Sequence, residues 1–200
     1  MNTVRKLHHL NAWERTSHVR TPGNIPAGCA ALAELLPAGG WPRRGLAEIT
    51  VPAEDTDVRP LIMPVLARFG RQARWLGMVA PPYSQRVGML SDTDEAASRL
   101  LQINPHAGRS GLWTMEQMLR SGNFSMVMAW PSCAAGLMAQ RLHKAAAAGN
   151  ALGLLFRVAP PSGTDSRIDA RLELEADGAG QVVYRLDRHG NRIAGAVLVS

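Results

Sequence analysis

The segment Leu119-Arg-Ser-Gly-Asn-Phe-Ser-Met-Val-Met-Ala-Trp130 predicts the end of a helix, a glycine stop and then a buried strand. Gly122 suits the left-handed residue that closes a helix, and Arg120 places a cation in the last turn, where a cation is favoured. The apolar run 124–130 has the length of a strand rather than that of a helix. A helix at about 134–148 and a second apolar run at 151–158 follow. This order predicts a right-handed crossover in a parallel sheet with helices packed against it.

The chain before this unit also alternates between strands and helices. Apolar residues at helical spacing predict the first long helix over 57–72, in which Pro60 suits the first turn and Pro64 should kink the helix or delay its start. A short helix is expected after Tyr83, through Met89 and Leu90. The other elements expected before residue 123 are a short helix over 27–36, strands over 45–51, 73–80 and 99–103, and a helix within 108–122.

The last third of the chain has a different pattern. Residues 167–175 alternate between apolar and charged side chains, which predicts a half-exposed strand with a salt-bridged outer face. Two more strands are expected over 181–187 and 193–199, with a turn at 189–191 between them. We therefore expect an α/β fold with a mostly parallel sheet flanked by helices and an antiparallel C-terminal extension.

The two ends of the sequence differ in character. Residues 1–26 are basic, with little apolar periodicity, and are expected to form a flexible arm in front of a single domain over 27–200. No apolar run is long enough to span a membrane, and the first 20 residues do not resemble a signal peptide, so a cytoplasmic protein is expected. The two cysteines, Cys29 and Cys133, are then expected to be reduced thiols.

The net charge is +6 and the sequence pI is about 10.3, which permits contact with nucleic acid or with an acidic protein. The arginines are scattered along the chain, so a solvated basic surface is the simpler interpretation, and direct contact with nucleic acid stays open.

Residue patterns typical of catalysis or of cofactor binding are weak in this sequence. The connection 49–57 between the first strand and its helix has neither the glycines nor the lysine of a phosphate-binding loop, and its acids Glu54, Asp55 and Asp57 would oppose a phosphate. Cys133 follows a strand and precedes a helix, where a thiol could be activated, but the pattern places no histidine beside it. The histidines of the basic arm have no cysteine or carboxylate partners at metal-ligand spacing. We expect no cofactor, no metal and no enzymatic activity.

A protein-binding surface is the remaining candidate site. Arg74, Trp75, Pro81, Pro82 and Tyr83 are expected to cluster at the carboxyl end of the second strand, where α/β proteins place their binding loops. Arginine and large aromatic residues are typical anchors of interfaces. The alternative is that Trp75 belongs to the core and Arg74 is a solvated strand end.

Three segments resemble SulA, the bacterial cell-division inhibitor. They are Leu61-Ile-Met-Pro-Val-Leu-Ala-Arg-Phe-Gly-Arg-Gln-Ala-Arg-Trp-Leu76, the segment 119–130 quoted above, and Ala147-Ala-Gly-Asn-Ala-Leu-Gly153. Together these similarities cover roughly residues 45–160. Other segments resemble ImuA, the accessory protein of mutagenic translesion synthesis: Gly39-Gly-Trp-Pro-Arg-Arg-Gly-Leu-Ala-Glu-Ile49, Val79-Ala-Pro-Pro-Tyr83 and Leu112-Trp-Thr-Met-Glu-Gln-Met-Leu-Arg-Ser-Gly122.

Both resemblances imply a RecA-like fold, here without a functional P-loop, and a role in the DNA-damage (SOS) response. The SulA resemblance, which we favour, implies a dimer that binds FtsZ and blocks its polymerisation without catalysis. Its binding residues carry over to Arg74, Val79, Met89 and Arg99, although Met89 stands where the family usually has tryptophan and Arg99 where it has lysine. The ImuA resemblance instead implies the mutasome as partner, with an ImuB-type polymerase-like protein, a replicative-type polymerase and RecA.

Overall fold

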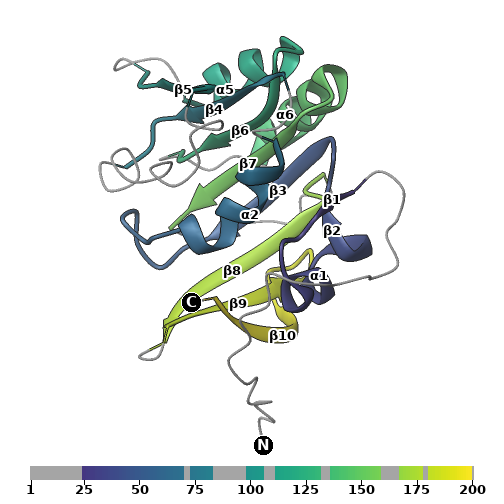
Figure 1. The fold of residues 1–200 in the computed structure, drawn as a ribbon, viewed down its shortest axis with the longest axis vertical. Coiled ribbons are helices and arrows are strands. Elements are labelled where there is room, and N and C mark those ends of the chain that lie inside the picture. Colours follow the sequence, from purple (N-terminus) through teal and green to yellow (C-terminus); the bar gives the residue numbers. More distant parts are fainter. Residues whose placement is uncertain are drawn as a thin grey trace, which may run out of the picture.

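The computed structural model describes residues 24–69, 73–82, 98–105, 111–131, 136–158, 167–177 and 180–199. Its centre is a mixed sheet of eight strands in the order β10-β9-β8-β3-β7-β6-β4-β5 (Figure 1). The strands from β8 to β5 pair in parallel, and β9 and β10 are antiparallel additions. The bounds are Gly45–Thr50 for β3, Trp75–Val79 for β4, Leu100–Ile103 for β5, Phe124–Ala129 for β6, Leu152–Arg157 for β7, Ala170–Asp177 for β8, Gly180–Leu186 for β9 and Arg192–Val199 for β10.

Helices cover both faces of this sheet. Helices α1 (Ala30–Leu35) and α2 (Arg59–Phe69) lie on one face, and α5 (Gly111–Arg120) and α6 (Gly136–Gly149) lie on the other (Figure 1). Each face carries its own apolar core because side chains alternate along a strand: Ala47 and Ile49 of β3 belong to the first core and Leu46 to the second. The expected α/β architecture with a mostly parallel sheet is therefore confirmed.

The first long helix begins two residues later than its periodicity predicts. It covers Arg59–Phe69 and contains Pro64, and residues 70–72 lie outside the described part of the chain. Asp57 marks its start, because one carboxylate oxygen accepts a hydrogen bond from the Arg59 N–H at 2.9 Å. Hydrogen bonds from the Arg59 side chain also hold the pKa of the Asp57 carboxyl below its ordinary value.

The C-terminal strands join the sheet differently from the prediction. The pairs β8–β9 and β9–β10 are antiparallel, as expected, but β8 pairs in parallel with β3. This pairing gives β3 a neighbour on each side, so β3 is a central strand. The half-exposed face expected for 167–175 is also partly wrong. Arg171 is buried, and its Nε lies 3.2 Å from Glu48 Oε2 on β3, while Arg157 Nη1 of β7 lies 2.7 Å from Glu48 Oε1. One buried carboxylate therefore joins three neighbouring strands.

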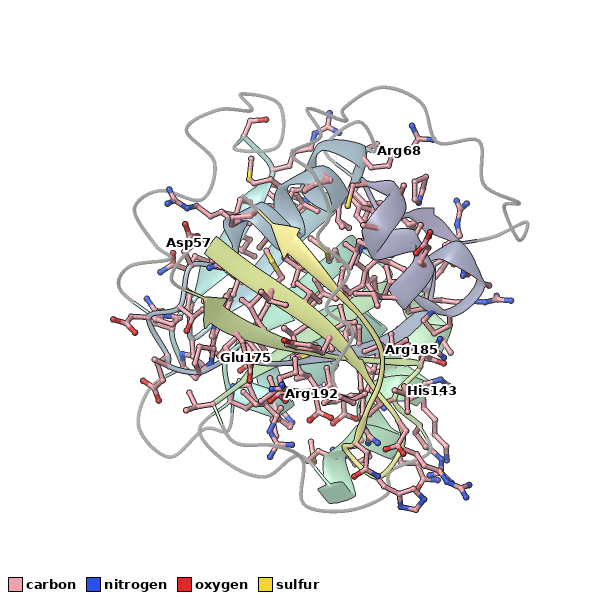
Figure 2. All side chains as sticks on the ribbon, turned by 90° about the horizontal axis from the view of Figure 1, so that it is seen from below. Asp57, Arg68, His143, Glu175, Arg185 and Arg192 are labelled. Atoms are coloured by element: carbon pink, nitrogen blue, oxygen red, sulfur yellow. The ribbon has the colours of Figure 1, made fainter. Side chains whose placement is uncertain are left out.

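The salt-bridged face is present farther out on the same strands. Arg192 of β10 pairs with Glu175 (Figure 2). It also pairs with Glu173 at 2.6 Å, and its guanidinium lies over the Tyr184 ring. Hydrogen bonds to the Glu173 and Glu175 carboxylates raise the pKa of Arg192 above its ordinary value. These ion pairs explain the charged residues at the outer end of β8, and they lie on the expected half-exposed face.

The first 23 residues lie outside the described part of the chain, and so does most of the expected arm. Its last residues, Ile25–Pro26, form strand β1, which pairs with β2 (Gly40–Trp41). A 3-10 turn over Pro37–Gly39 leads into β2.

Cys29 is a free thiol. Cys133 and the short helix expected through Met89 lie outside the described residues. Within the described residues, no helix has the length and hydropathy to cross a membrane.

Candidate protein-binding site

The predicted site residues lie at both ends of β4. Trp75 begins this strand and Val79 ends it, so Arg74 is at the amino end while Pro81 and Pro82 follow the carboxyl end. Four steps along a strand span about 13 Å. The expected cluster of Arg74, Trp75 and the proline loop at the carboxyl end is therefore wrong, and Tyr83 and Met89 lie outside the described residues.

Arg74 binds backbone rather than presenting a free guanidinium. Its Nη1 donates to the Asn150 carbonyl oxygen at 2.8 Å, and its Nη2 donates to the carbonyl oxygens of Gly149, at 2.5 Å, and of Phe124. Burial of the side chain lowers the pKa of the Arg74 guanidinium from its ordinary value. The carbonyls at the end of α6 would otherwise lack intrahelical donors, so Arg74 joins this helix end to β6.

We expect Arg74→Ala to lower the free energy of unfolding by about 2 kcal/mol, because carbonyls at a packed helix end lose charged donors. Urea unfolding followed by circular dichroism measures this change. Arg68→Ala removes an exposed arginine from α2 and should change stability by less than about 0.5 kcal/mol. Equal stability of the two variants would show that Arg74 does not hold this junction.

The segments that carry the SulA resemblance meet beside Arg74. Gly149 lies against the end of α5, where a Cβ atom would fall onto the Leu119 carbonyl oxygen. Gly122 has a φ of +75° and Asn150 a φ of +50°, so each ends a helix in the left-handed conformation. The Trp75 N–H donates to the Asn123 carbonyl oxygen at 2.9 Å. The residues that carry the SulA resemblance here, Gly122, Asn123, Gly149 and Asn150, therefore form the junction between α5, α6 and β4.

Val79 cannot contact a partner through its side chain, because that side chain is fully buried in the core under α5. Trp75, in contrast, is 47% exposed, so the interpretation of this residue as core is wrong. Leu101 of the edge strand β5 is 41% exposed. Alternation along β4 puts Trp75 on the same face as Gly77, and Gly77 is the register partner of Leu101. Trp75 and Leu101 therefore share one face.

Arg99 lies beside this pair in the chain and in the sheet. It immediately precedes β5, is half-buried, and accepts the Leu76 N–H on its carbonyl oxygen at 2.9 Å. We call Trp75, Leu101 and Arg99 the β4–β5 surface. Trp75 and Arg99 are candidates from the sequence, whereas Leu101 is not, because the pattern predicts a strand there without showing that the strand lies at the sheet edge. Exposed aromatic and arginine side chains beside apolar area are typical of protein interfaces.

Within the described ranges, no three His, Cys, Asp or Glu side chains come together as metal ligands. His143 of α6 lies 3.4 Å from Asp169, and that carboxylate also accepts the Leu46 N–H. This pair links α6 to the start of β3.

The fold defines a mixed α/β protein whose β4–β5 surface carries exposed apolar side chains. A family model described as "Cell division inhibitor SulA" matches residues 45–153, more than half of the 200 residues. The chain therefore belongs to the SulA family, and the favoured resemblance is confirmed. The matched region ends within β7, so β8, β9 and β10 lie beyond it.

Two SulA sequences agree with this assignment. A cell division inhibitor SulA from Photorhabdus laumondii is 32% identical over 117 residues, which cover 58% of this chain and 66% of that protein. One from Pectobacterium carotovorum is 30% identical over 171 residues, which cover 80% of this chain and 94% of the relative. The crystal structure of SulA from Pseudomonas aeruginosa aligns with a TM-score of 0.46 at 25% identity, covering 56% of this chain and 96% of that one.

Proposed function

We propose that this protein inhibits cell division in the SOS response by binding FtsZ and blocking its polymerisation, without catalysis of its own. The observation that carries the proposal is the SulA family match over residues 45–153. A RecA-like fold, a cytoplasmic location and a homodimer belong to the same proposal. The acids of the 51–57 connection, which contains neither glycine nor lysine, support a fold without nucleotide chemistry.

The β4–β5 surface is our proposed contact with FtsZ. Its support is the combination of two exposed apolar side chains on one face with an arginine beside them. Val79 is left out because it is buried, and Arg74 is assigned a positioning role, since its donors are used on backbone carbonyls. The matches described above are to SulA proteins. The alternative of an ImuA-like protein with mutasome partners is therefore supported only by the sequence resemblance.

Light scattering of purified FtsZ with GTP tests this contact. We expect Trp75→Ala and Leu101→Ala each to raise the concentration needed for half-inhibition by about tenfold, because truncating an interface anchor costs one or more kcal/mol of binding. Ile193→Ala is the matched control, since it removes an exposed apolar side chain from β10, at the opposite edge of the sheet.

Two results of this assay distinguish the proposed β4–β5 surface from the proposed inhibition of FtsZ. Inhibition that is unchanged in folded Trp75→Ala and Leu101→Ala proteins would exclude the β4–β5 surface while leaving the family function in place. Failure of the unmodified protein to inhibit would contradict the function itself.

A further inference from the structure

The outer face of α5 and α6 is unusually basic for two packed helices. The two helices contain the cations Arg120, Arg141 and Lys144, which are exposed, and a single acid, Glu116, which is buried. His143, on the same helix as Arg141, pairs instead with Asp169. The exposed face between the two helices therefore carries positive charge without exposed acids of its own.

Glu116 forms ion pairs with two of these cations. Its side chain is almost completely buried, with Oε1 2.8 Å from Arg120 Nη2 and Oε2 2.7 Å from Arg141 Nη2. The Arg120 and Arg141 side chains are nevertheless 56% and 54% exposed. Two guanidiniums share one carboxylate, so the group keeps a net positive charge. The N–H groups that a guanidinium leaves exposed match the geometry of phosphate oxygens.

Trp113 extends this face along α5. It is 43% exposed and lies three residues before Glu116 and seven before Arg120, so the three residues form one stripe about 10 Å long. Lys144 lies three residues after Arg141 and extends the charge along α6. The face therefore places an aromatic surface next to three cations.

We propose that this face binds single-stranded nucleic acid. The guanidiniums of Arg120 and Arg141 and the ammonium of Lys144 contact backbone phosphates, and a base stacks on Trp113. An acidic protein segment would neutralise the cations, but its carboxylates would not stack on the half-exposed Trp113 indole. Every nucleobase, in contrast, has a flat face that can stack on an aromatic side chain. The side chains of this face differ from those of the contact proposed for FtsZ.

Fluorescence anisotropy of a labelled oligothymidylate of about 15 nucleotides tests the proposal on the full-length protein. We expect binding at low salt that weakens steeply as salt rises. Trp113→Ala should weaken it about fivefold or more, and Lys144→Ala should weaken it severalfold and reduce the salt dependence. Neither variant removes a partner of Glu116, so both should stay folded.

Arg68→Ala is the matched control for charge, because it also removes one cation. Arg68 belongs to α2 and lies on the other side of the sheet from His143 of α6 (Figure 2). Its loss should change oligonucleotide affinity by less than about twofold, as for a charge outside the contact. The proposal is overturned if the protein does not bind the oligonucleotide at low salt. It is also overturned if the three variants bind alike, which would place the contact elsewhere, or if polyglutamate binds with equal affinity and Trp113→Ala has no effect.

Discussion

Gly149→Ala is expected to lower the free energy of unfolding by about 3 kcal/mol or more. The added Cβ would fall onto the Leu119 carbonyl oxygen and would come within 3.3 Å of the Gly122 nitrogen. Both contacts are with backbone, so no side-chain rotation can relieve them. Helix α6 would have to move away from α5, and the carbonyls that Arg74 binds would move with it.

Gly122→Ala is the matched control at the same junction. Gly122 has a φ of +75°, but no atom lies within 4 Å of the position that an added Cβ would take, so alanine there meets only backbone strain. We expect a loss of about 1 kcal/mol. Chemical denaturation of both variants gives the comparison. Equal losses would mean that close approach of the helix ends is not what requires glycine at 149.

Glu48→Ala is expected to cost about 3–5 kcal/mol of folding free energy. The Arg157 and Arg171 side chains are nearly buried, and the described ion pairs of both are with Glu48. Removing the carboxylate takes the described acidic partner away from two nearly buried cations. The damage should reach the junction of β7, β3 and β8, because Glu48 joins these three strands.

Glu175→Ala tests whether burial is the cause of this cost. Glu175 pairs with Arg192 on the half-exposed outer face, where Arg192 also keeps its contact with Glu173 (Figure 2). A loss of less than about 1 kcal/mol is expected for an exposed pair. Similar losses for Glu48→Ala and Glu175→Ala, measured by thermal and urea unfolding, would contradict the interpretation of Glu48 as a buried link.

The central part of this fold could be predicted from local signals. Gly122 ends a helix, and the apolar runs on either side of α6 are strands, as their length and composition indicate. The position of β8 could not be predicted in this way, because its neighbour β3 lies more than 100 residues earlier in the chain. The alternation around Arg171 predicts an exposed arginine, but the long-range pairing with Glu48 buries it.

The candidate site was harder to predict than the fold. Arg74 has the residue type of an interface anchor, and only its contacts with Asn150 and Gly149, about 75 residues away, reveal a positioning role. Leu101 belongs to a predicted strand, but its exposure depends on that strand lying at the sheet edge. Residue type and spacing can therefore point to a strand, whereas tertiary contacts decide which of its side chains are exposed.

The central proposal is that this protein inhibits FtsZ by binding it. Sedimentation of FtsZ polymers with GTP, at increasing molar ratios of this protein, tests it most directly. We expect polymer to fall in proportion to added protein and to disappear near equimolar amounts, with the protein found beside unpolymerised FtsZ in the supernatant. Unchanged polymer at excess protein would contradict binding, and complete loss at trace amounts would contradict a non-catalytic mechanism.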